Sequence, residues 1–161
     1  MSAQTLRWPE CDLRVRPPRS PRDTLAGLVL LPRTIDKARA IVQGTAGLYK
    51  VTPGLSGYLL RELGVEEDAF MALIESGAED DAVADWIVAH SDPDGFGAIN
   101  AMLTARAIRD QAHFEEVLPR YPVLREHPEL RNWFEILELD DVWSFDPVNA
   151  AAVKAAAPGS D

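Results

Sequence analysis

A predicted amphipathic helix begins with the stretch Leu30-Leu31-Pro32-Arg33-Thr34-Ile35-Asp36-Lys37-Ala38-Arg39-Ala40. We expect the other elements to be arranged around this helix. Pro32 suits a first helical turn because it has no N–H to donate, and Gly44 suits the end of the helix. One face is apolar and carries Ile35, Ala38, Ile41 and Val42. The other face carries Arg33, Asp36, Lys37 and Ala40. We expect Arg39, beside the apolar stripe, to be partly covered and to need a carboxylate partner.

Outward from this helix, short periodic segments separated by Gly, Pro and Asp predict further helices. These segments cover residues 20–31, 56–63, 65–77, 80–90, 98–118 and 128–137. Residues 20–31 are also compatible with one kinked helix that continues past Pro32. A short strand is predicted at Leu48–Val51. We therefore expect an all-α fold, a single compact domain of six or seven short helices around one core.

Composition divides the chain into three parts. Residues 1–18 contain three prolines and predict an extended arm, which Trp8 or Leu13 pins to the body. Residues 19–145 form the predicted helical domain. Residues 146–161 form an alanine-rich tail that we expect to be partly disordered.

Length and composition are those of a globular protein. The 161 residues are 47% hydrophobic and 26% charged, which is typical of one domain with a sizeable core. No apolar run reaches the length of a membrane-spanning helix, and the polar first residues do not resemble a secretory signal. Because Cys11 is the only cysteine, an internal disulfide is impossible, and we expect a reducing, cytoplasmic location.

The net charge of −10 is unevenly distributed along the chain. Residues 1–50 hold nine Lys/Arg against four Asp/Glu, whereas residues 51–161 hold seven against 22. One interpretation is that the basic opening segment packs on the acidic body. The other is that it forms a basic patch for an anionic partner. The overall acidity makes a nucleic-acid partner unlikely, since nucleic-acid surfaces usually belong to basic domains.

Several segments together resemble a known family. Arg16–Arg22, followed by Leu31–Arg33 and Ile35–Ala40, resembles the opening signature of the bacterial family catalogued as domain of unknown function 5069. Asp85–Ile87 and Asn132–Glu138 look like its middle and closing motifs. The resemblance implies a small, soluble bacterial protein without an assigned activity, and it carries over no catalytic residue.

The sequence lacks the common catalytic and metal-binding motifs. Cysteine and histidine are too scattered for a zinc site. A calcium loop starting at Asp92 would have Phe96 and Leu103 at its fifth and twelfth positions, where oxygen ligands are required. The spacing around Ser56 is not that of a nucleophile elbow, so we interpret Ser56 as a helix cap. Neither phosphate-binding glycine motif occurs. We expect no metal, no cofactor and no catalytic residue.

The candidate site is a cluster of cations beside two predicted helix starts. Its cations are Arg19, Arg22, Arg33, Lys37 and Arg39, with Asp36 among them and Tyr49 and Tyr58 as a possible rim. Free N–H groups and forked guanidinium donors suit a phosphate or carboxylate. The alternative is internal pairing, of Asp36 with Arg33 or Arg39, and of Arg39 with a carboxylate such as Glu135 or Asp140.

Three functions follow from these patterns. The first is a non-catalytic binding or interaction module whose Arg/Lys-lined face accepts a small anion or an acidic protein segment. The second is a small enzyme with Asp36 and Lys37 as an acid/base pair and an arginine clamp. The third, nucleic-acid binding through the basic arm, requires steep salt dependence and is disfavoured by the net charge. No membrane association is expected, and the sequence does not predict an oligomeric state.

Overall fold

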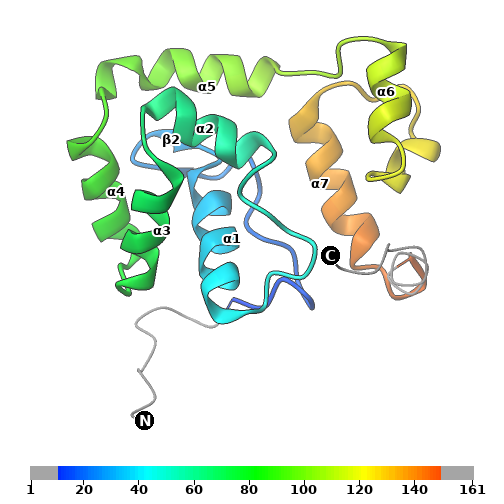
Figure 1. Ribbon diagram of the computed structural model, residues 1–161. Helices are drawn as coiled ribbons and strands as arrows, with labels where there is room; N and C mark the ends of the chain where they lie inside the picture. Colours follow the sequence, from blue (N-terminus) through cyan, green and yellow to red (C-terminus); the bar gives the residue numbers. More distant parts are fainter. Residues whose placement is uncertain (1–10, 150–161) are drawn as a thin grey trace. The chain divides into compact units, whose positions relative to one another are not determined.

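Helices dominate the part of the chain that the computed structural model describes, residues 11–149 (Figure 1). The helices are α1 (Leu31–Gln43), α2 (Leu55–Leu63), α3 (Glu67–Glu75), α4 (Asp80–Ala89), α5 (Phe96–Ala105), α6 (Gln111–Val117) and α7 (Trp133–Ser144), with 3₁₀ turns η1 (Pro93–Gly95) and η2 (Pro122–Arg125). Two short strands, β1 (Thr24–Leu25) and β2 (Leu28–Val29), pair antiparallel. The predicted all-α fold is confirmed. The chain forms two compact units, which meet in the sequence between Leu103 and Thr104.

Helix α1 is the most deeply buried helix of the first unit. Pro32 lies in its first turn, and Gly44 ends it with φ 75°, as the sequence predicts. However, every residue from Leu31 to Ala40 except Asp36 is buried, whereas Ile41, assigned to the apolar face, is 40% exposed. The predicted charged face is therefore covered by protein except at Asp36. The reason is that β1, α2 and α3 all contact α1, which leaves no continuous stripe for water.

The segment before α1 is a β-hairpin, so the helix predicted over residues 20–31 is wrong. Leu25 pairs with Leu28, and the two residues between them, Ala26 and Gly27, have φ values of 53° and 75°. Two positive φ values at the centre of a two-residue loop match the twist of a hairpin. Asn100 of α5 fixes this turn, since its Nδ2 donates to the Gly27 carbonyl at 2.7 Å. The strand predicted at Leu48–Val51 is also wrong, because those residues form turns and bends.

The predicted long helix over residues 98–118 is two helices, α5 and α6. The segment between them pairs with the chain before α7: Ala107 bridges Asn132, and the Trp133 N–H donates to the Arg106 carbonyl at 3.0 Å. Asp110 then caps α6 by accepting the His113 N–H at 2.8 Å. The apolar spacing continues through this break, which is why the sequence pattern suggests one helix.

The second unit has a core of its own. Its buried side chains are Ile108, Phe114, Val117, Leu124 and Ile136. Asn132 caps α7 by accepting the N–H groups of Phe134 and Glu135, so this helix begins at residue 133 and ends at 144 rather than spanning the predicted segment 128–137. Within residues 11–149, no helix has the length and apolar character needed to cross a bilayer.

The predicted terminal segments lie mostly outside the described residues. Of the arm, residues 11–18 are described and contain turns but no helix or strand. Leu13 is buried against Ala40, and its N–H donates to the Thr45 carbonyl at 2.9 Å. Trp8 lies outside the described range, as does the tail beyond residue 149.

Candidate functional site

An ion-pair network joins three segments of the first unit: the chain before β1, helix α1 and the start of α4. Arg19 Nη2 lies 3.1 Å from Asp36 Oδ1 on α1, and Arg19 Nη1 lies 2.7 Å from Asp80 Oδ2 at the start of α4. Arg39 Nη1 contacts the other Asp80 oxygen at 2.9 Å, and its Nη2 donates to the Ala78 carbonyl at 3.1 Å. Two guanidinium groups of the predicted cluster thus have carboxylate partners inside the protein.

The charged forms of Arg19 and Asp80 are favoured in this network. Burial opposes the charge on Arg19, but the hydrogen bonds to Asp80 and Asp36 outweigh burial and raise the pKa of Arg19 above its ordinary value. Burial also opposes the charge on Asp80. The hydrogen bond and charge of Arg19, together with Arg39, outweigh it and hold the pKa of Asp80 below its ordinary value. Arg19 is therefore paired with Asp36 and Asp80, and Arg39 with Asp80, a partner that sequence reasoning missed when it suggested Glu135 or Asp140 for Arg39.

Arg33 lies close to the same network and contacts the Arg19 carbonyl and the Tyr49 ring. Its side chain is 1% exposed, and its Nη1 donates to the Arg19 carbonyl at 3.3 Å. Its guanidinium carbon lies 5.7 Å from the centre of the Tyr49 ring, a cation–π distance. The structure thus brings Arg33, the Arg19 carbonyl and Tyr49 together, and it buries Arg33 from solvent.

Lys37 is directed to a buried hydroxyl pair rather than to Asp36. Its Nζ donates to Ser56 Oγ at 3.3 Å, and the hydroxyl oxygens of Ser56 and Thr34 lie 2.9 Å apart. Thr34 Oγ1 also lies 2.9 Å from the Leu30 carbonyl. Because Thr34 has one hydroxyl proton, its donation to Leu30 leaves Ser56 as the donor to Thr34. This network joins the first turn of α2 to α1.

Ser56 is not the helix cap that the sequence predicts. It lies within α2, and Gly54 occupies the cap position. An amine beside a serine hydroxyl is also a known arrangement for an activated nucleophile. Here Ser56 is 0% exposed and Lys37 is 7% exposed, so both groups are buried from solvent. No local pattern relates residue 37 to residue 56.

The remaining predicted site residues lie apart from this group. Arg22 is exposed in the turn before β1. Tyr58 lies on α2, where its ring stacks with Arg61 at 4.5 Å from the guanidinium carbon to the ring centre. Tyr58 thus lies on α2 beside Arg61.

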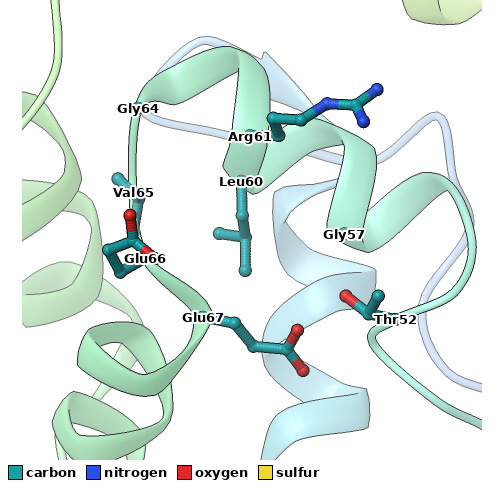
Figure 2. A pocket seen from close by; sticks show the side chains of 8 residues that line it. All are labelled: Thr52, Gly57, Leu60, Arg61, Gly64, Val65, Glu66 and Glu67. Carbon is teal, nitrogen blue, oxygen red and sulfur yellow. The ribbon is translucent and has the colours of Figure 1, made fainter.

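A hollow of about 260 Å³ lies beside α2, where the chain turns into α3 (Figure 2). Its lining residues are Thr52, Gly57, Leu60, Arg61, Gly64, Val65, Glu66 and Glu67. Figure 2 shows Glu67 extending toward Thr52, while the Arg61 guanidinium extends away from them. Sequence reasoning missed this hollow because its residues come from a loop, a helix and a helix start.

The charge around this hollow is strongly acidic. Residues 51–103 hold eleven Asp/Glu against a single cation, Arg61. Nine of these acids are exposed: Glu62, Glu66, Asp68, Glu75, Glu79, Asp81, Asp85, Asp92 and Asp94. We refer to these nine residues as the acidic surface. Despite this density, residues 11–149 contain no group of three or more His, Cys, Asp or Glu side chains placed to hold a metal ion.

Comparison with known proteins agrees with the family resemblance seen in the sequence. The family model described as Domain of unknown function (DUF5069) matches residues 15–142, which is most of the chain. No curated protein matches the chain.

Proposed function

We propose that the chain, which belongs to the DUF5069 family, is a non-catalytic interaction module whose acidic surface binds a basic partner. The observation that carries this proposal is the charge of residues 51–103, with eleven acids, nine of them exposed, and the single cation Arg61. An exposed field of one sign steers and selects partners of the opposite sign. Of these eleven acids, Asp80 belongs to the internal ion-pair network.

The geometry favours a basic partner over the anion that the Arg/Lys cluster suggests. Arg33, Lys37 and Arg39 are each buried, and Arg19 and Arg39 already contact carboxylates. A phosphate would have to displace those carboxylates or reach a buried guanidinium. Among the five cations of the cluster, Arg22 alone is classed as exposed.

A non-catalytic role is supported by the separation of the reactive groups. The Asp36 carboxylate contacts Arg19, and the Lys37 amine contacts Ser56, so the acid/base pair of the enzyme hypothesis does not converge on one cleft. The Ser56 hydroxyl, which accepts from the Lys37 amine, is fully buried. A bacterial, cytoplasmic setting remains a prediction from the resemblance and the cysteine content.

The test compares three probes by isothermal calorimetry: an eight-lysine peptide, an eight-glutamate peptide and inorganic phosphate. We expect the lysine peptide to bind, with an affinity that falls as salt is added, because exposed charges are screened. Glu66→Gln/Asp92→Asn should weaken binding about two- to thirty-fold, since each exposed ion pair contributes about 0.2–1 kcal/mol. The matched control is Glu115→Gln/Glu116→Gln on α6, which makes the same charge change outside this surface.

Two outcomes would contradict the proposal. Equal weakening by both double variants would show that net charge, and not this surface, attracts the peptide. Binding of phosphate or the glutamate peptide, without the lysine peptide, would instead identify the predicted Arg/Lys cluster as the binding face.

A further inference from the structure

We propose that the hollow between Thr52 and Glu67 binds the side chain of a lysine, with its ammonium group held by those two residues. This inference rests on the proposed function, since it names the side chain that a basic partner would place in this hollow, whose lining includes Glu66 of the acidic surface. Its starting point is a hollow of about 260 Å³ lined by two apolar side chains, Leu60 and Val65, which we call its floor, and by the polar side chains Thr52, Arg61, Glu66 and Glu67, which we call its rim. Leu60 and Val65, on the floor, are 2% and 7% exposed.

Two of the rim groups are available to a ligand. Glu67 Oε1 and Oε2 and Thr52 Oγ1 form no hydrogen bond or ion pair with any residue in the range 11–149. Figure 2 shows the Glu67 side chain extending toward Thr52, with Leu60 descending from α2 to one side of them. A carboxylate and a hydroxyl so placed offer acceptors to the same donor group.

The backbone fixes both sides of the hollow. Gly57 lets Thr52 lie against α2, because a Cβ at that position would lie 2.3 Å from Thr52 Oγ1. The Gly57 N–H donates to the Val51 carbonyl at 2.9 Å, which holds the loop on the helix. On the other side, Gly64 ends α2 with φ 71°, and the Val65 N–H donates to the Leu60 carbonyl at 2.9 Å. The rim is therefore positioned before any ligand arrives.

The chemistry of the hollow selects a lysine over other ligands. The aliphatic stem of lysine packs on an apolar floor while its ammonium group, with three donors, contacts polar groups at the rim. An anion is repelled by Glu67. Calcium requires six to eight oxygen ligands, more than one carboxylate and one hydroxyl supply. A carboxylate in the first turn of α3 also stabilises the helix dipole, which by itself would explain Glu67. The helix dipole does not explain the hydroxyl and the apolar floor opposite Glu67.

The experiment titrates the full chain with n-pentylammonium and follows backbone amide shifts by NMR. We expect saturable shifts at Gly57, Gly64 and Glu67, and no such shifts with 1-pentanol, which has the same stem without the charge. Glu67→Gln should weaken binding about tenfold, because it removes the charged acceptor. Thr52→Val, which keeps the shape and removes the hydroxyl, should weaken binding by less. The matched control, Glu75→Gln at the other end of α3, should bind like the wild type.

Unchanged affinity in Glu67→Gln, or shifts centred elsewhere, would overturn the lysine site. The eight-lysine peptide separates this failure from failure of the proposed function. If the peptide binds equally well to the wild type and to Glu67→Gln, the lysine site is wrong while the acidic surface stands. If the peptide does not bind but pentylammonium binds in the predicted manner, the hollow is an amine site and the proposed function is wrong.

Discussion

Arg19 and Asp80 lie 61 residues apart in the chain, yet their side chains form an ion pair with Nη1 and Oδ2 at 2.7 Å. Asp80 also contacts Arg39, so one carboxylate connects the chain before the hairpin, helix α1 and helix α4. This relationship makes the predicted cation cluster part of the framework of the first unit.

Asp80→Asn should destabilise the protein. Arg39 is largely buried and would keep its charge while losing this carboxylate. We expect a loss of about 1–2 kcal/mol in the free energy of unfolding, at the low end for a network pair because Asp80 is partly open to solvent. Urea denaturation measures this change, and Asp81→Asn at the exposed neighbouring position is the control. Equal stabilities of the two variants would show that the network contributes nothing.

The contribution of Asp80 should depend on pH. The pKa of Asp80 is lowered in the folded state, so its stabilisation is complete above the ordinary value of 3.8 and is lost as the pH falls below that value. Urea denaturation of the wild type and Asp80→Asn at a series of pH values tests this. The difference in unfolding free energy should be constant near neutrality and shrink in acid. A difference that grows in acid would contradict the direction of the pKa shift.

Ser56→Ala should destabilise the protein, and Ser56 should not react as a nucleophile in the wild type. The change removes a buried hydroxyl that contacts both Lys37 and Thr34, so we expect a loss of about 1–3 kcal/mol in unfolding free energy. A fluorophosphonate probe, which modifies activated serines, should not label the native wild type. Labelling that disappears in Ser56→Ala would show instead that Ser56 is an accessible nucleophile.

Cys11 should react slowly in the folded protein. Its side chain is buried, and burial, followed by the negative charge of Asp36, raises the pKa of its thiol. Because the thiolate is the reactive species, modification by a disulfide reagent should be slow in buffer and fast in denaturant. The release of the coloured thiol product measures both rates. Equal rates would mean that this segment opens freely.

Much of the secondary structure follows from local signals. Pro32 at the start of α1 and the glycines at positions 44, 64 and 77 after α1, α2 and α3 mark helix ends through their own backbone preferences. Acidic residues in the first turns of α3 and α4 mark helix starts in the same way. These signals act within a few residues, so they are legible without a structure.

Local signals fail where distant segments compete for the same residues. In the hairpin at 24–29, Asn100 accepts the Val29 N–H and donates to the Gly27 carbonyl, and at the break between α5 and α6 the chain pairs with Asn132. Nothing in the sequence of the hairpin or of the break between α5 and α6 indicates that Asn100 or Asn132 is its partner. The apolar spacing there fits a helix, and only the contacts show otherwise.

The sequence alone determined the helical class, the family, and the cations and acids available to any site. The tertiary structure decided which of those charges face water. The periodicity of the sequence predicts which side chains share a face of α1. It does not predict which other elements cover that face, because those elements come from distant parts of the chain. That is why Arg33 and Lys37, on the predicted charged face, are buried, while nine acids of α2–α4 and the turn after α4 are exposed as the acidic surface.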